Sequence, residues 1–132
     1  MTYLVDTDWV IDHLRQVETT TKKLEELAPE GLALSIVSLA ELYEGVYYSR
    51  NPEQSEAILK SFLSPELEVL GIDEETSQIF GRERGRLRPQ GRSIGDMDLF
   101  IAATALRHNL TLLSNNRRHF ELVHGLEIIS IN

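Results

Sequence analysis

Acidic and amide side chains stand where the predicted β-strands of this chain end. Asp6 directly follows the first predicted strand, Glu41 lies one helical turn after the second, and Asn116 follows the fourth. Asp96 and Asp98 open the helix that precedes the fourth strand. Ligands of open α/β sheets bind at the carboxyl ends of the strands. These groups can therefore meet at one edge of a sheet although they are far apart in the sequence.

Carboxylate and amide oxygens are ligands that suit Mg2+ or Mn2+. The chain has no Cys, and its four histidines show no metal-ligand spacing, so no role is assigned to His13, His108, His119 or His124. Three acids crowded together without a cation would raise the pKa of at least one of them by mutual repulsion. A bound Mg2+ can polarise a phosphoryl oxygen, lower the pKa of a water molecule and hold an in-line attack. The acids therefore predict metal-dependent hydrolysis of phosphodiester bonds.

Strands and helices are expected to alternate along the chain. Short apolar runs predict strands at residues 3–5, 32–37, 67–72, 110–113 and 126–131. Helical spacing predicts helices over 7–15, 22–28, 38–48, 73–87 and 96–108, and one more that begins at Asn51-Pro52. This alternation implies βαβ crossovers and a parallel sheet covered on both faces. The predicted fold is a three-layer α/β/α sandwich with a mostly parallel sheet of about five strands, in a single domain over residues 1–132.

The composition narrows the classes of partner. The 132 residues match the size of one ordinary domain. They include 21 acids against 13 Lys and Arg, a net charge of −8, so general binding of polyanions is not expected. The absence of Cys excludes disulfides and fits a reducing compartment. The sequence has neither a signal-peptide pattern nor an apolar run of about 18 residues, so a soluble cytoplasmic protein without membrane contact is expected.

Four segments of the chain resemble the four motifs of PIN-domain proteins, specifically the VapC-type toxins of prokaryotic toxin–antitoxin pairs. In chain order the segments read LVDTDWVID from Leu4, SIVSLAEL from Ser35, IGDMDLFIAA from Ile94 and LLSNNRRHF from Leu112. The resemblance covers essentially the whole chain with family-like spacing. It implies an endoribonuclease that requires Mg2+ or Mn2+ and cleaves RNA. It also implies a cognate VapB-type antitoxin that blocks the site, and a homodimer.

The motifs also imply roles for single residues. Asp6 and Asp98 would be metal ligands, and Glu41 would act directly or through metal-bound water, so these three are predicted to be catalytic. Many family members have Asp at the fourth motif position, where this chain has Asn116. The neutral amide favours hydrogen bonding to a water or a phosphate. Asn116 is therefore predicted to be an accessory residue. Asp96 and Thr7 are also predicted to be accessory residues.

Each acid also has a structural interpretation. Asp6 could cap the helix that follows it. Glu41 could close a capping box with Ser38. Asp96 is well placed as an N-cap, and Asp98 could be a first-turn acid favoured by the helix dipole. Taken together and in motif order, the acids favour a metal site.

Arginines form the second notable pattern. Residues 81–92 contain five of the ten arginines and one Glu. Guanidinium groups bind phosphates through paired hydrogen bonds, so these side chains could seat an RNA backbone or contact an acidic segment of the antitoxin. A solvated helix face is the alternative. The predicted contact residues are Arg82, Arg84, Arg86, Arg88 and Arg92, with Arg117 and Arg118 beside the fourth motif.

Two other functions compete with the ribonuclease. Asp6-Thr7-Asp8 also fits the nucleophile and acid of a haloacid-dehalogenase-like phosphatase. That chemistry requires a Lys, however, and Lys60 is predicted inside an amphipathic helix, while Glu41 would have no role. The other alternative is a PIN-like interaction module without catalysis. The intact acids argue against such a module, and Asn116 leaves room for it.

Overall fold

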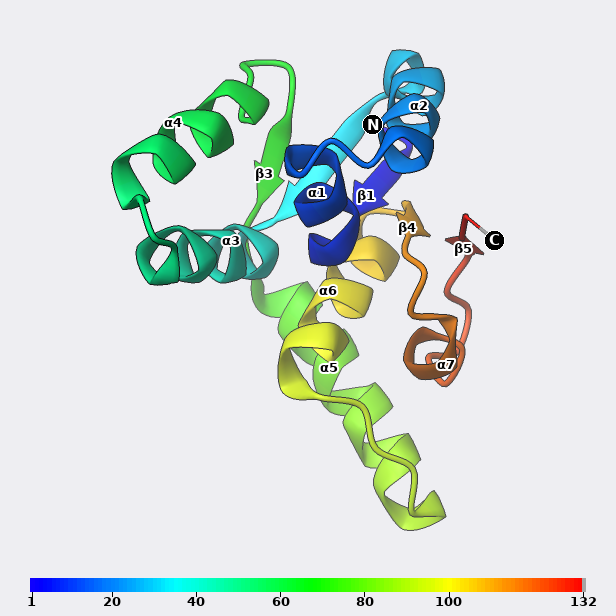
Figure 1. Ribbon diagram of the computed structural model, residues 1–132. Coiled ribbons are helices and arrows are strands. Elements are labelled where there is room, and N and C mark those ends of the chain that lie inside the picture. Colours follow the sequence, from blue (N-terminus) through cyan, green and yellow to red (C-terminus); the bar gives the residue numbers. More distant parts are fainter. Residues whose placement is uncertain (132) are drawn as a thin grey trace.

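In the computed structural model, which describes residues 1–131, a five-stranded parallel sheet lies between two layers of helices (Figure 1). The strand order is β3-β2-β1-β4-β5, so β1 is the central strand. The strands are β1 (Tyr3–Val5), β2 (Leu32–Ser35), β3 (Glu68–Leu70), β4 (Thr111–Leu113) and β5 (Ile128–Ile129). The predicted α/β class and the five-stranded parallel sheet are confirmed.

Helices connect the strands and cover both faces of the sheet. They are α1 (Thr7–Leu14), α2 (Glu18–Leu27), α3 (Ile36–Tyr48), α4 (Pro52–Phe62), α5 (Glu74–Leu87), α6 (Asp96–Arg107) and α7 (Arg117–Phe120). The short 3-10 helices η1 (Ala28–Glu30) and η2 (Arg88–Gln90) follow α2 and α5. Figure 1 shows the C-terminal end of α5 extending away from the sheet. Within residues 1–131, no helix is both long and apolar enough to cross a membrane.

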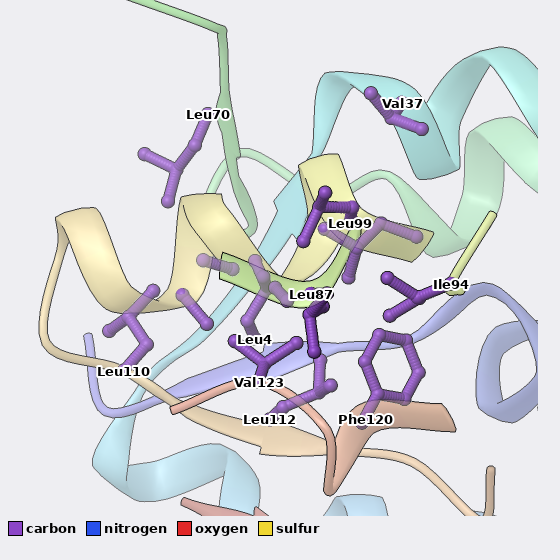
Figure 2. Packing of buried hydrophobic residues seen from close by; sticks show 14 residues of the cluster. Leu4, Val37, Leu70, Leu87, Ile94, Leu99, Leu110, Leu112, Phe120 and Val123 are labelled. Atoms are coloured by element: carbon purple, nitrogen blue, oxygen red, sulfur yellow. The ribbon is translucent and has the colours of Figure 1, made fainter. Parts of the chain in front are cut away.

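The central strand contributes side chains to two hydrophobic cores, because successive residues of a strand face opposite sides of the sheet. Leu4 lies in the core that contains Leu99 of α6 and Leu112 of β4 (Figure 2). Val5 lies in the other core, together with Trp9 of α1. A strand covered on both faces needs apolar residues at every position, which is why β1 shows no polar alternation.

The helix that carries Glu41 begins two residues earlier than the sequence pattern predicts. Its N-cap is Ser35, whose Oγ accepts the backbone N–H of Val37 at 3.1 Å. Ser38 lies inside the first helical turn, so the predicted helix start and the capping box with Glu41 are wrong. The β preference of branched residues is weak, so it does not prevent Ile36 and Val37 from lying in the first turn of α3, where Val37 is buried in the core.

The interpretation of Asp96 as an N-cap is also wrong. Gly95 occupies the N-cap position of α6, and Asp96 is the first residue of the helix. Its Oδ1 accepts a hydrogen bond from Arg84 Nη2 at 2.6 Å. The guanidinium on α5 therefore holds this carboxylate, which accepts no backbone N–H of its own first turn.

The remaining boundaries follow local signals closely. Asn51 caps α4 and Asp73 caps α5, as predicted, and each side chain accepts a backbone N–H three residues later. α2 begins at Glu18, four residues before its predicted start, and includes the buried Thr20. β3 and β5 are shorter than the apolar runs that predicted them.

Ser35→Ala should lower the free energy of unfolding by about 1 kcal/mol, because it removes the side-chain cap of α3. Glu41→Gln should not lower it, since Gln keeps an acceptor for the Thr7 hydroxyl and no cap is lost. Urea denaturation followed by circular dichroism measures both variants. An equal loss of stability in Glu41→Gln would contradict this expectation and would show that the charge of Glu41 stabilises the fold as much as the Ser35 cap does.

Candidate active site

A cavity of about 260 Å³ opens where the central strands end. Its walls come from the residue after β1, from α1, α3 and α6, and from the segment after β4. The lining residues are Asp6, Thr7, Asp8, Ile11, Glu41, Asp98 and Asn116. The structure thus brings together the three acids predicted to be catalytic and two of the predicted accessory residues. The third accessory residue, Asp96, does not line the cavity.

Asp6 is held in one orientation by two hydrogen bonds. Its Oδ1 accepts the backbone N–H of Thr7 at 2.9 Å, and its Oδ2 accepts the hydroxyl of Ser114 at 2.6 Å. Asp6 is therefore the N-cap of α1 and a wall of the cavity at the same time. Ser114 is fully buried, and sequence reasoning did not select it. The available signal was a hydroxyl at the end of β4, directly before two asparagines.

The environment of Asp6 disfavours its charged form. Burial, followed by the negative charge of Asp8, raises the pKa of Asp6 from 3.8 to about 8. The hydrogen bonds from Ser114 and from the Thr7 N–H act in the opposite direction without compensating. Near neutral pH the folded protein therefore retains a proton on Asp6 that the unfolded chain releases. A cation beside the carboxylate would take the place of that proton.

Glu41 is positioned by a neighbouring helix. The Thr7 hydroxyl lies 2.7 Å from Glu41 Oε1 and 2.9 Å from the Ser38 hydroxyl. One hydroxyl has a single proton, so Thr7 donates to the carboxylate and Ser38 donates to Thr7. This arrangement ties α1 to α3 and fixes one oxygen of Glu41 beside the cavity.

Asp98 and Asn116 line the cavity, and both lie near His119 of the fourth motif. Oδ2 of Asp98 lies 3.6 Å from His119 Nδ1, and the same nitrogen lies 3.1 Å from Asn116 Nδ2. The backbone N–H of Asn116 donates to the Ser114 hydroxyl at 3.0 Å. The sequence assigned no role to His119. Its spacing of three residues from Asn116, which places both on one side of a helical turn, was the signal that could have found it.

The two adjacent asparagines have different tasks. Asn115 Oδ1 accepts the indole N–H of Trp9 at 3.2 Å and the backbone N–H of Ile131 at 2.8 Å. Asn115 therefore joins α1 to the segment after β5, whereas Asn116 lines the cavity.

The donor set fits a hard divalent cation, because every carboxylate and amide at the cavity offers oxygen. The raised pKa of the buried Asp6 is a further reason for a cation at this place. Within residues 1–131, no three acidic or histidine side chains stand close enough to hold one ion as they lie. Asp6 is fixed by its hydrogen bonds, so coordination requires the half-buried Asp98 or the free oxygen of Glu41 to turn toward it.

Three of the seven arginines predicted to contact RNA or antitoxin form hydrogen bonds or ion pairs within the protein itself. Arg84 bonds the start of α6, Arg86 donates to the carbonyl of Leu122, and Arg117 pairs with Glu121. The other four are exposed and form no side-chain hydrogen bond or ion pair with any part of the chain that the structure describes. They are Arg82, Arg88, Arg92 and Arg118.

Known proteins resemble this chain in sequence and in structure. The family model of the PIN domain matches residues 3–125. Ribonuclease VapC2 of Haemophilus influenzae is 34% identical over 124 residues, which cover 94% of this chain and 93% of the relative. The tRNA(fMet)-specific endonuclease VapC of Shigella flexneri is 32% identical with the same coverage. A chain in the crystal structure of VapBC2 from Rickettsia felis, bound to a DNA fragment from their promoter, superposes with a TM-score of 0.92 at 31% identity, and the match covers 100% of both chains.

Asp8→Asn should lower the pKa of Asp6, because it removes the neighbouring negative charge. The folded wild type holds the Asp6 proton more tightly than the unfolded chain. This contribution to stability is therefore complete below the unfolded pKa and is lost as the pH rises through about 8. Carboxyl carbon NMR measures the midpoint directly, and urea denaturation between pH 4 and pH 9 measures the stability.

Asp12→Asn is the matched control, since Asp12 lies on the same helix but does not line the cavity. We expect the loss of stability to move to lower pH in Asp8→Asn and to stay in place in Asp12→Asn. An Asp6 midpoint near 4 in the wild type would contradict the prediction.

Proposed function

This chain belongs to the PIN-domain family, and from that premise we propose that it is the endoribonuclease toxin of a VapBC-type toxin–antitoxin pair. Relatives that are more than 30% identical over 94% of the chain are named as VapC ribonucleases or endonucleases. The observation that carries the proposal is the gathering of Asp6, Glu41 and Asp98 from three separate elements around one cavity. RNA is the proposed substrate, a VapB-type antitoxin and a second copy of the chain are the proposed partners, and the cytoplasm is the proposed location.

We propose that the cavity binds Mg2+ or Mn2+ through Asp6 and Asp98. When bound, the ion would polarise a phosphoryl oxygen and lower the pKa of the attacking water. Asp6 must give up its proton to become a ligand, so ion binding is coupled to proton release. The hydrogen bonds from Ser114 and Thr7 leave the orientation of Asp6 unchanged when it does so.

Glu41 is the proposed general base. The Thr7 hydroxyl holds its Oε1, so Oε2 remains to accept a proton from the attacking water. Asn116 cannot add negative charge, and its amide can donate to a phosphate oxygen or to a water at the same cavity. In this proposal Asp6 and Asp98 hold the ion, Glu41 acts on the water, and Asn116 donates to a phosphate oxygen or to a water.

The two alternative functions fit the structure less well. A phosphatase of the haloacid-dehalogenase type requires a Lys at the carboxylates, but Lys60 lies on α4 and pairs with Glu56 at 3.3 Å. An interaction module without catalysis would gain nothing from three acids at one cavity, because burying the Asp6 carboxylate costs stability.

The proposed antitoxin site lies next to the cavity. A mainly apolar hollow of about 290 Å³ shares Ile11 and Glu41 with the cavity, and Leu42, Val46 and Leu59 are among its other lining residues. An apolar segment of the antitoxin bound there would lie against Glu41 and cover the acids. The similar chain from Rickettsia felis belongs to a VapBC structure, which supports a partner of this kind.

The protein, purified without antitoxin, should cleave RNA in Mg2+ or Mn2+ and stop in EDTA. Asp98→Asn should weaken ion binding, and Glu41→Gln should remove the proton acceptor. Each should lower the cleavage rate by at least about a hundredfold. Gel analysis of a labelled cellular RNA fraction measures cleavage, and circular dichroism checks that the variants are folded.

The matched control is Glu44→Gln, which removes an exposed acid one turn after Glu41 on the same helix. Its cleavage rate should stay close to that of the wild type. Wild-type activity in Asp98→Asn or Glu41→Gln would overturn the site.

We propose that RNA contacts the exposed arginines near the end of α5. Arg82, Arg88 and Arg92 are exposed and form no ion pair within residues 1–131 of a protein whose net charge is −8. Arg84 ties the same helix to the start of the helix that bears Asp98. Arg88 follows Arg84 by four residues, about 6 Å of helix rise. Asp96 is two residues from Asp98, so an RNA strand that leaves the cavity along α5 would meet these arginines.

Changing Arg82, Arg88 and Arg92 together to Gln should weaken RNA binding. It should also reduce the slope of log affinity against log salt by about 2, since each phosphate contact on a single strand contributes roughly 0.7. Fluorescence anisotropy in the Asp98→Asn background measures binding without cleavage. Changing Lys22, Arg50 and Lys60 to Gln alters the net charge equally at other surfaces. Equal losses in the two triple variants would exclude a local RNA contact.

A further inference from the structure

One imidazole lies beside two residues of the cavity, Asp98 and Asn116, but is not among the residues that line it, and it has no part in the chemistry proposed so far. His119 lies on α7, with its Nδ1 3.6 Å from Oδ2 of Asp98. We propose that His119 and Asp98 bind the same divalent cation, and that this nitrogen ligand makes the site prefer Mn2+ to Mg2+. The inference rests on the proposed metal-dependent function and decides between its two candidate ions.

The distance between the two groups is close to the spacing that a shared ion requires. A separation of 3.6 Å is too long for a hydrogen bond between Nδ1 and a carboxylate oxygen. Two ligands at adjacent corners of an octahedral ion lie about 3.0 Å apart when each is about 2.1 Å from the metal. A shift of roughly half an ångström in either side chain would bring them to that spacing.

The Nδ1 lone pair of His119 is available to a metal. Asn116 Nδ2, which can only donate, lies 3.1 Å from it, so with the Asn116 amide in this orientation the contact requires a neutral ring whose proton is on Nε2. This neutral tautomer is the one that binds metals. A cation bound to Nδ1 would displace the hydrogen bond from the Asn116 amide. A half turn of that amide would then present its oxygen to the ion or to a bound water.

The backbone of His119 is well fixed although its side chain is 49% exposed. The next residue, Phe120, is fully buried in the core. At the start of the same turn, Arg117 donates to the carbonyl of Ile128 at 3.2 Å and to the Ser130 hydroxyl at 3.1 Å. The ring can therefore turn toward Asp98 without displacing α7.

A neutral imidazole changes which ion the site favours. Both ions suit oxygen ligands, but Mg2+ parts reluctantly with its waters, whereas Mn2+, as a first-row transition-metal ion, accepts an imidazole nitrogen more readily than Mg2+ does. The imidazole also adds a donor without adding to the negative charge of the acids. Two of the other histidines have different surroundings, since His13 contacts the hydroxyl of Thr21 and His124 follows the core residue Val123 near Glu83.

Pulsed electron paramagnetic resonance of Mn2+ added to the purified wild type tests the proposal. A directly bound imidazole gives a nitrogen coupling, which should change in protein labelled with nitrogen-15 histidine and vanish in His119→Asn. Calorimetric titration with MnCl2 and MgCl2 should show Mn2+ affinity falling by at least about tenfold in His119→Asn, with Mg2+ affinity little changed. His124→Asn is the matched control, because it removes an exposed histidine outside the cavity.

The outcomes separate this inference from the function on which it rests. Mn2+ that binds in the wild type, weakens in Asp98→Asn and shows no nitrogen coupling would overturn the role of His119 and leave the metal centre standing. Failure of Mn2+ and Mg2+ to bind at all would overturn both. The wild-type spectrum decides the matter even if His119→Asn fails to fold.

Discussion

The carboxylate of Asp6 lies at the end of the central strand with only 5% of the residue exposed, and much of the site holds it in place. Moving an ionised carboxylate out of water costs several kcal/mol even after the protein relaxes. A hydrogen bond to a charged group returns about 1.5–3 kcal/mol. The hydrogen bonds from Thr7 and Ser114 therefore offset the cost only in part, and the pKa of Asp6 rises to about 8. Binding of a proton or a cation removes the remaining cost of burying the ionised carboxylate.

The contacts around Asp6 also join the elements that carry the other site residues. Ser114 donates to Asp6 and accepts the backbone N–H of Asn116, so one buried hydroxyl sets the position of both. The backbone N–H of Thr7 donates to Asp6, the N-cap of α1, and the side chain of Thr7 holds Glu41. A substitution at Ser114 or Thr7 would thus disturb several groups of the cavity at once, although neither residue is an acid.

Residues of the same type have different roles, which depend on the partners that lie beside them in the fold. Asn115 stabilises the packing of α1 against the segment after β5, and its neighbour Asn116 faces the cavity. Among the arginines near the end of α5, Arg84 and Arg86 bond the protein's own chain, while the others remain exposed. An acidic protein can therefore keep a local basic surface near its acids, because only part of the basic cluster is used internally.

Features decided within a few residues could be predicted from the sequence. The strand-and-helix alternation, the caps at Asn51 and Asp73, and the likeness of four motifs to the PIN-domain family all depend on local order in the chain. The start of α3 could not be predicted, because Ser35 and Ser38 are both suitable caps by residue type, and only the structure shows that Ser35 accepts the backbone N–H of Val37.

The partners of the site residues were decided by tertiary structure alone. Ser114 meets Asp6 across 108 residues, and Thr7 meets Glu41 across 34. Such pairs depend on the strand order and on how the helices pack, and residue spacing carries no record of either. The order of strands and helices in the sequence predicted that the acids lie at one edge of the sheet. Only the tertiary structure shows that His119 lies beside Asp98 and that Asp96 pairs with Arg84.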